Sequence, residues 1–242
     1  MKTAIITSVY YPENSNQKFN IVSSVLDNIP KYAGVDYDLF IVNDGTKDPR
    51  FEEFMKNYKP REFCKSIDYY SRENRGITKS MNELLARIDS SYDYICLINL
   101  DILVPVYWLK KCISVLKHDK KVGLCGVLVE DHLEFDLKNG IGQTKDSVLF
   151  SHVVSIGGAC MVFRADELKG YGWDEDVLTS NHIDSYMISR YRMDGRSSYA
   201  ILERGYHSRE LYESKEFIDA KFARHESELP NFYKALDKVK NK

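Results

Sequence analysis

An apolar segment near the middle of the chain ends in a single carboxylate. Residues 94–100 are mostly apolar and lead directly into Asp101. Such a run predicts a strand that is buried on both faces of a parallel sheet, and ligands of open α/β sheets bind beyond the carboxyl ends of the strands. We therefore expect Asp101 to lie at a ligand site. The alternative, that Asp101 caps the next helix, is less favoured because Pro105 and the apolar residues before it separate the two.

Asn99 lies two residues before Asp101. On an extended chain the side chains of residues two apart point the same way, so both could reach one ligand or its waters. Carboxylate and amide oxygens suit Mg²⁺ or Mn²⁺, and these ions commonly keep substrate phosphates in their coordination shell. The segment is therefore predicted to hold a divalent metal together with a phosphate-bearing ligand.

Two earlier segments carry residues suited to binding a nucleotide. Asp44 follows the apolar residues 39–42, and a carboxylate at a strand end can accept hydrogen bonds from a base or a ribose. An Asp-Gly turn with no chemistry is the simpler alternative there. Arg75 precedes a predicted helix that contains Lys79, and a helix N-terminus with two cations favours an anion. The simpler alternative at that site is a solvated start of a helix.

The later half of the chain offers three further candidates. The pair Gly157-Gly158 interrupts a strand-like segment, which suggests the close approach of a ligand or of another backbone segment. Asp184, near the start of a predicted helix, could act as a general base or could merely complement the helix dipole. His207 lies in a predicted loop, where a single histidine most often has no special role.

Strands and helices that alternate over the first hundred residues must position these side chains. This alternation predicts an α/β fold with a mostly parallel central sheet flanked by helices. The predicted strands are residues 3–9, 37–42, 66–69, 94–101, 122–129, 153–163 and 198–202. The predicted helices are 19–29, 49–58, 77–88, 104–116, 183–192 and a charged C-terminal stretch, with long loops at 131–146 and 203–210.

The composition is that of an ordinary globular protein. The net charge is −2, so nothing requires a nucleic acid or an anionic membrane as partner. No segment has the length of a transmembrane span, and the first apolar run is too short for a signal peptide. The five cysteines include no C-x-x-C pair, which favours reduced thiols and a cytoplasmic location.

Taken in order, these segments resemble glycosyltransferase family 2, whose members have the GT-A fold. The matching segments are residues 41–48 (V-x-D-G-S-x-D in the family), 74–76 with 81–82 (N-x-G and a following asparagine), 97–101 (D-x-D), 157–164 (a glycine-rich strand), 170–175 (G-G-F-D-E), 183–195 (E-D-x-D-x-x-x-R with a later glycine) and 206–207 (a terminal histidine). The resemblance covers roughly residues 3–210.

The resemblance implies a metal-dependent, inverting transferase that moves a sugar from a UDP-sugar to an acceptor hydroxyl. Asp44 would bind the base and ribose, Asp101 would bind the metal with His207 as second ligand, and Asp184 would be the catalytic base. The other expected nucleotide-binding residues are Ser8, Tyr10, Arg75, Lys79 and Asn99. The expected acceptor-side residues are Gly158, Trp173, Asp174 and Glu175.

The same resemblance suggests how the chain is organised. Residues 1–212 would form one GT-A domain, with a nucleotide-binding half at about 1–101 and an acceptor-binding half at about 102–212. Residues 213–242 would form a helical tail. The acceptor, whether a glycan, a lipid-linked sugar, a protein or modified DNA, does not follow from the sequence.

Two positions depart from the family pattern. Asn99 replaces the first acid of D-x-D, and Ile183 replaces the glutamate before the proposed base. These departures keep open a non-catalytic module that binds nucleotide sugars. They also leave Asp174, Glu175 and Asp176 as rival acids to Asp184. A sugar nucleotidyltransferase is a further alternative, but the residues after the first strand, 8–12, lack the glycine-rich, arginine-bearing loop of that class.

Overall fold

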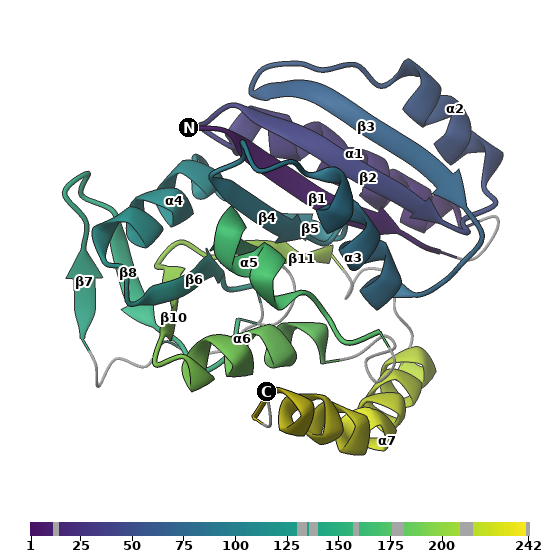
Figure 1. The fold of residues 1–242 in the computed structure, drawn as a ribbon. Coiled ribbons are helices and arrows are strands. Elements are labelled where there is room, and N and C mark those ends of the chain that lie inside the picture. Colours follow the sequence, from purple (N-terminus) through teal and green to yellow (C-terminus); the bar gives the residue numbers. More distant parts are fainter. Residues whose placement is uncertain are drawn as a thin grey trace.

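The computed structural model describes residues 1–11, 15–129, 135, 140–156, 160–175, 182–208 and 215–240. Its strands form a nine-stranded sheet and a short two-stranded ladder. The sheet contains β1 (Thr3–Val9), β2 (Tyr37–Asp44), β3 (Cys64–Arg72), β4 (Tyr94–Ile98), β6 (Val122–Val127), β7 (Ile141–Gln143), β8 (Leu149–His152), β9 (Cys160–Arg164) and β10 (Ser197–Ile201). The ladder pairs β5 (Ile102–Leu103) with β11 (Tyr206–His207). The strand order of the sheet is β3-β2-β1-β4-β9-β6-β10-β8-β7 (Figure 1).

Most strands of this mixed sheet run in one direction. β1 is parallel to β2 and β4, β2 is parallel to β3, and β6 is parallel to β10. β9 is antiparallel to β4 and β6, and β8 is antiparallel to β10 and β7, so β8 and β9 run against the other seven strands. The predicted α/β class with a mostly parallel sheet is confirmed. The carboxyl ends of β2, β1 and β4 consequently meet at one edge.

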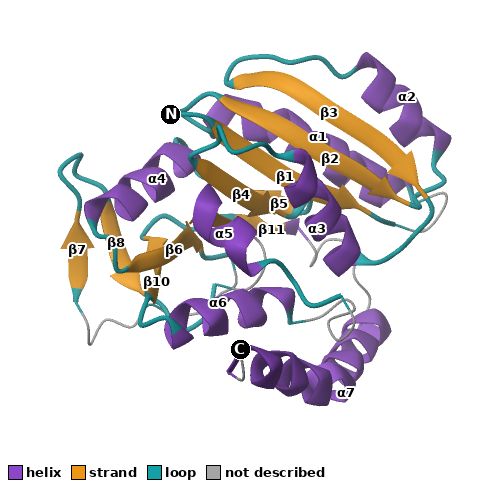
Figure 2. Ribbon diagram, in the orientation of Figure 1, coloured by secondary structure: helices purple, strands orange, loops and turns teal. Residues whose placement is uncertain are grey.

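Helices cover both faces of the sheet (Figure 2). They are α1 (Asn16–Tyr32), α2 (Pro49–Asn57), α3 (Ile77–Arg87), α4 (Trp108–His118), α5 (Ala165–Tyr171), α6 (Ile183–Met193) and α7 (Lys215–Lys240). Apolar side chains of α1, α2 and α4 pack in one core with Ile5, whereas those of α3, α5, α6 and α7 pack in a second core with Ile6. Successive residues of β1 thus enter opposite cores, as the alternation of a strand requires.

β4 is a fully buried central strand, as its apolar sequence predicted. All of its residues are buried, and it lies between β1 and the antiparallel β9. The strand ends at Ile98, however, and residues 99–101 form a turn that leads into β5. The expectation that Asn99 and Asp101 continue the extended strand is therefore wrong, because the ladders on both sides of β4 stop before them.

Five elements were absent from the sequence prediction, namely the strands β5, β7, β8 and β11 and the helix α5. The predicted loop at 131–146 contains β7, and β8 follows it, so a hairpin extends the sheet beyond β10. Helix α5 follows β9 directly and was missed because it is short. The β5–β11 ladder was missed because two-residue strands show no periodicity.

Element boundaries moved where the backbone has special geometry. α4 begins at Trp108 rather than at residue 104, after Pro105 and a left-handed Tyr107 with φ of 60°. The C-terminal stretch is helical, as predicted. The predicted boundary between residues 212 and 213 lies outside the described residues. Within the described parts of the chain, every helix is too short or too polar to serve as a transmembrane segment.

Candidate functional site

Asp101 and His207 lie together beyond the end of β4. His207 Nε2 is 3.5 Å from Asp101 Oδ2. The β5–β11 ladder brings them together, since His207 pairs with Ile102, the residue after Asp101. Ser208 closes the arrangement, because its backbone N–H and its hydroxyl donate to the Asp101 carbonyl at 2.8 and 2.7 Å. Two segments that are far apart in sequence thus present a carboxylate and an imidazole to one point.

This pair fits a divalent metal that takes its remaining ligands from a substrate. The side chains of Asp101 and His207 are 26% and 11% exposed, so both are reachable from solvent yet fixed by the fold. A carboxylate oxygen and an imidazole nitrogen are both suitable ligands for Mn²⁺. Within the described residues, no group of three or more His, Cys, Asp or Glu side chains forms a complete cage. Two protein ligands suit an ion that keeps phosphate oxygens and waters in its shell.

Asp44 ends β2 and holds the loop that leads into α3. Its carboxylate accepts hydrogen bonds from the backbone N–H groups of Arg75 and Gly76 at 2.9 and 3.0 Å. Arg72 Nη2 lies 3.1 Å from Asp44 Oδ1, and Asp44 is only 2% exposed. The Asp-Gly segment is therefore more than a turn. Its carboxylate fixes the N-terminal approach of α3, and the sequence did not predict this role.

Gly45 lets the loop after β2 press against the loop before α3. Its φ is +95°, and a Cβ on this residue would lie 2.7 Å from the backbone N of Asn74. The same loop also contacts the end of β1, because Thr46 Oγ1 accepts a hydrogen bond from the N–H of Tyr11, which follows β1. The loop after β2 therefore joins the end of β1 to the start of α3.

The remaining nucleotide-binding candidates occupy the same edge of the sheet. Ser8 lies near the end of β1, opposite Val42 of β2, and Tyr10 follows β1 with 62% of its surface exposed. Asn99 lies in the turn after β4 and is partly buried. Arg75 and Lys79 lie before and within the first turn of α3, and both are exposed. Arg75 also faces Glu83, with Nη1 and Oε1 3.5 Å apart.

The acceptor-side candidates divide between surface and core. Asp174 Oδ2 forms an ion pair with Lys238 Nζ of α7 at 2.8 Å, and Glu175 accepts a hydrogen bond from Asn82. Trp173 is buried, so its ring belongs to the core rather than to an open binding surface. Gly158 lies outside the described residues.

Asp184 lies in the first turn of α6 and is partly buried. The preceding carbonyl, that of Ile183, accepts a hydrogen bond from Trp173 Nε1 at 3.0 Å. The N-cap residue, His182, is buried, and its ring lies 5.3 Å from the ring of Phe232 on α7. The start of α6 is therefore held by side chains from two other segments.

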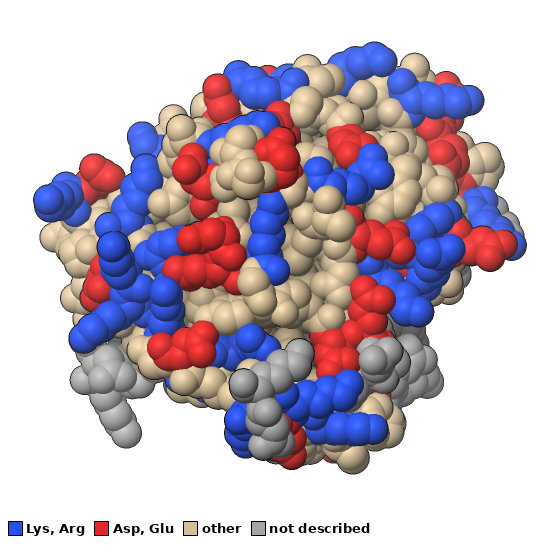
Figure 3. Space-filling view, in the orientation of Figure 1, with Lys and Arg blue, Asp and Glu red and all other residues tan. Residues whose placement is uncertain are grey.

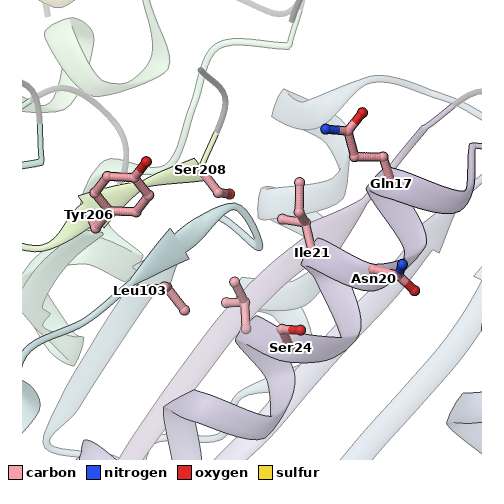
Figure 4. A pocket seen from close by; sticks show the side chains of 8 residues that line it. Gln17, Asn20, Ile21, Ser24, Leu103, Tyr206 and Ser208 are labelled. Carbon is pink, nitrogen blue, oxygen red and sulfur yellow. The ribbon is translucent and has the colours of Figure 1, made fainter. Parts of the chain in front are cut away.

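A pocket of about 270 Å³ adjoins the Asp101 turn on the side of α1 (Figure 4). One wall is formed by α1, and the facing wall by the β5–β11 ladder and Ser208. Ser208 belongs both to this wall and to the hydrogen bonds that hold the Asp101 carbonyl. No role for Ser208 was predicted from the sequence. Its only available signal was its place directly after His207.

Comparisons with known proteins agree with this architecture. A model of the family described as glycosyl transferase family 2 matches residues 20–169. The poly-beta-1,6-N-acetyl-D-glucosamine synthase of Staphylococcus aureus is 24% identical over 188 residues, which cover 70% of this chain. The chain spans 43% of the length of that relative.

Solved structures show the same fold at low sequence identity. A mannosyltransferase from Pyrobaculum calidifontis in complex with GDP-Man and Mn²⁺ has a TM-score of 0.56 at 16% identity, covering 81% of this chain and 53% of its own. GalNAc-T7 with UDP, GalNAc and Mn²⁺ has a TM-score of 0.63 at 7% identity, covering 85% and 43%. A fragment of TarS from Staphylococcus aureus has a TM-score of 0.59 at 12% identity, covering 83% and 60%.

These structures confirm the expected GT-A fold, and the family match confirms the resemblance that the ordered motifs indicated. Since the family model matches more than half of the chain, this protein belongs to glycosyltransferase family 2.

Proposed function

We propose that the chain transfers a sugar from a nucleotide-diphosphate donor to an acceptor hydroxyl, with Mn²⁺ or Mg²⁺ bound by Asp101 and His207. The observation that carries this proposal is the 3.5 Å approach of these two side chains beyond the carboxyl end of β4. The loops that follow β1 and β2 lie at the same edge of the sheet, where a nucleotide would bind in an α/β fold.

The donor that we propose is a UDP-sugar. GalNAc-T7 was solved with UDP, and the Staphylococcus aureus relative is named as a synthase of an N-acetylglucosamine polymer. The mannosyltransferase was solved with GDP-Man, so GDP-sugars are the first competitors to test. Asp44, Ser8 and Tyr10 would contact or position the base and ribose. Arg75, Lys79 and Asn99 would lie toward the diphosphate.

The proposed reaction is an inverting displacement. The oxygen of the acceptor hydroxyl attacks the anomeric carbon, the bond from that carbon to the diphosphate oxygen breaks, and the nucleoside diphosphate leaves. Asp184 takes the proton of the hydroxyl as general base. The metal ion, when bound, offsets negative charge on the leaving diphosphate. Asp101 and His207 would hold the ion there, with Asn99 in the place of the first acid of D-x-D.

The proposed acceptor side lies in the later half of the chain. We propose that residues 1–101 bind the nucleotide and that residues 102–212 present the acceptor to Asp184, with Asp174 and Glu175 beside it. On the face shown in Figure 3, basic and acidic side chains are interspersed rather than gathered into the continuous basic surface that duplex DNA favours. Together with the net charge of −2, this favours a glycan, a lipid-linked sugar or a protein as acceptor over modified DNA. The five cysteines of the chain are free and buried, which supports the cytoplasm as the location of this protein.

A donor-hydrolysis panel tests the proposal. UDP-N-acetylglucosamine, UDP-N-acetylgalactosamine, UDP-glucose and GDP-mannose would each be incubated with the protein in Mn²⁺, in Mg²⁺ and in chelator. We expect metal-dependent release of nucleoside diphosphate from a UDP-sugar, with water acting as the acceptor.

A matched control strengthens the panel. Asp36→Ala removes an exposed carboxylate that pairs with Lys65 far from the site, so this variant should behave like the unmodified protein. Asp101→Ala should lose the metal-dependent release. Tight binding of a nucleotide sugar without release from any donor would instead favour a non-catalytic binding module.

A further inference from the structure

The peptide group that joins Ile183 to Asp184 is fixed by a side chain from another segment. Trp173 Nε1 donates a hydrogen bond to the Ile183 carbonyl at 3.0 Å. That carbonyl and the backbone nitrogen of Asp184 belong to one planar peptide unit. A hydrogen bond to the carbonyl therefore restricts the orientation of the first backbone atoms of Asp184. Both Trp173 and Ile183 are buried, so water does not compete with this bond.

Trp173 is itself held at both ends of its backbone by one side chain. Asn82 Oδ1 accepts a hydrogen bond from the N–H of Trp173 at 3.0 Å, and Asn82 Nδ2 donates to the carbonyl of Trp173 at 2.8 Å. The same Nδ2 donates to Glu175 Oε1 at 2.8 Å. A planar amide that makes two bonds to one residue fixes both its position and its orientation. Asn82 thereby aims the indole of Trp173 at the start of α6.

The residue before this start has a backbone conformation that the surroundings must impose. His182 has φ of 64° and ψ of 10°, a left-handed conformation that residues other than glycine adopt at an energetic penalty. Among the residues that the structure describes, no side-chain hydrogen bond caps the helix there, and the His182 ring packs near Phe232 of α7. Such strain persists only where neighbouring structure fixes it, and it often marks a functional position. The entry into α6 is thus set by tertiary contacts.

We propose that Asn82 and Trp173 are positioning residues that set the direction of the Asp184 side chain. The proposal rests on the proposed role of Asp184 as general base. Asn82 lies on α3, whose N-terminal approach is held by Asp44, so a single helix extends from the proposed nucleotide loop to the support of the proposed base. A base must lie within hydrogen-bond reach of the proton that it removes, and a displacement of about 1 Å can lower a rate about 10²-fold.

The alternative is that Asn82 and Trp173 only stabilise the fold. In that case a substitution of either residue would lower the melting temperature, but the folded variant would release UDP at the normal rate. Two substitutions separate these cases. Trp173→Phe keeps an aromatic ring and removes the indole N–H. Asn82→Ala removes the two hydrogen bonds to the backbone of Trp173, and Asn82 itself is only partly buried.

A control variant removes a comparable hydrogen bond elsewhere. The Tyr58 hydroxyl donates to the Leu26 carbonyl on the opposite face of the sheet. Tyr58→Phe deletes that bond while keeping the ring. It should change the melting temperature as Trp173→Phe does and should leave turnover unchanged.

The measurements are kcat and KM for Mn²⁺-dependent release of UDP from UDP-N-acetylglucosamine, with UDP affinity measured by calorimetry. For Trp173→Phe and Asn82→Ala we expect kcat to fall about tenfold or more, with UDP affinity unchanged within about twofold. If Trp173→Phe is too unstable to assay, Asn82→Ala alone decides. Unchanged kcat in folded variants would overturn the proposal.

A double-mutant cycle adds a readout that a purely structural role would not give. Because the two residues act through Asp184, adding Trp173→Phe to Asp184→Asn should lower the residual rate no further. A full additional loss in that background would overturn the positioning role. If Asp184→Asn itself turns over normally, the assignment of the base fails, and that result is separate from the outcome of the cycle.

Discussion

The imidazole Nε2 of His207 lies 3.5 Å from the carboxylate Oδ2 of Asp101. The contact depends on the pairing of β5 with β11, which places His207 opposite Ile102. Ser208 then ties its own backbone to the Asp101 carbonyl. A short ladder outside the main sheet therefore brings this carboxylate and this imidazole together.

The first prediction concerns Asp184. Asp184→Asn keeps the size of the side chain and removes its capacity to take a proton. We expect UDP affinity to remain nearly intact while the rate of transfer falls about 10²-fold or more. Steady-state kinetics and calorimetry on the same preparation measure both quantities. Normal turnover would move the role of base to another acid such as Glu175.

The second prediction concerns Gly45. Gly45→Ala forces a left-handed conformation on alanine and drives its Cβ to 2.7 Å from the backbone N of Asn74. Strain and overpacking together should lower the free energy of unfolding by about 3 kcal/mol. The displaced loop should also weaken UDP binding, because Asp44 would lose its hold on the N–H groups of Arg75 and Gly76.

Gly140 provides the matched control for this substitution. Its φ is +77°, but a Cβ there would meet no described residue within 4 Å. Gly140→Ala should therefore lose only about 1 kcal/mol from backbone strain, with UDP affinity unchanged. If urea denaturation showed the same loss of unfolding free energy for Gly45→Ala and Gly140→Ala, the contact with Asn74 would contribute nothing to stability.

The third prediction concerns Asp48, the N-cap of α2. Its carboxylate accepts hydrogen bonds from the backbone N–H of Arg50 at 3.0 Å and from Arg50 Nε at 2.8 Å. The guanidinium of Arg50 lowers the pKa of Asp48 below its usual value. Because the folded pKa is the lower one, the unfolded state takes up the proton first, and stability is lost as the pH falls through the folded pKa.

Asp48→Asn tests this pH dependence while keeping a good N-cap residue. The variant should be less stable than the unmodified protein above about pH 3.9, the usual pKa of an aspartate. The difference should shrink as the pH falls below that value. Denaturation curves between pH 3 and pH 7 measure it, and a difference that is constant with pH would contradict the ion-pair account.

The sequence predicted the parts of the site that buried strands carry. The apolar runs before Asp44 and Asp101 indicated strands, and the carboxyl ends of parallel strands meet at one edge. Asn43 and Asp48 show the limit of such reasoning. Asn43 forms hydrogen bonds with Thr46 and Glu52 across the loop after β2, and Asp48 caps α2. Neither role shows in the hydrophobic periodicity of the sequence.

Other parts depend on tertiary contacts that local sequence does not encode. The approach of His207 to Asp101 needs a two-residue ladder, and only the family resemblance suggested it. Trp173 was predicted on the acceptor side from a motif, but its burial and its bond to Ile183 depend on how α6 packs. Likewise, α4 begins at Trp108, later than predicted, because Tyr107 before it has a left-handed backbone conformation that the local sequence does not indicate.

Calorimetry of UDP binding with and without Mn²⁺ tests the central claim, that Asp101 and His207 hold a metal on the donor diphosphate. The unmodified protein and Asp36→Ala should bind UDP more tightly in Mn²⁺ than in chelator. Asp101→Ala and His207→Ala should bind UDP with the same weaker affinity in both. Metal-dependent tightening that persists in Asp101→Ala would contradict the account.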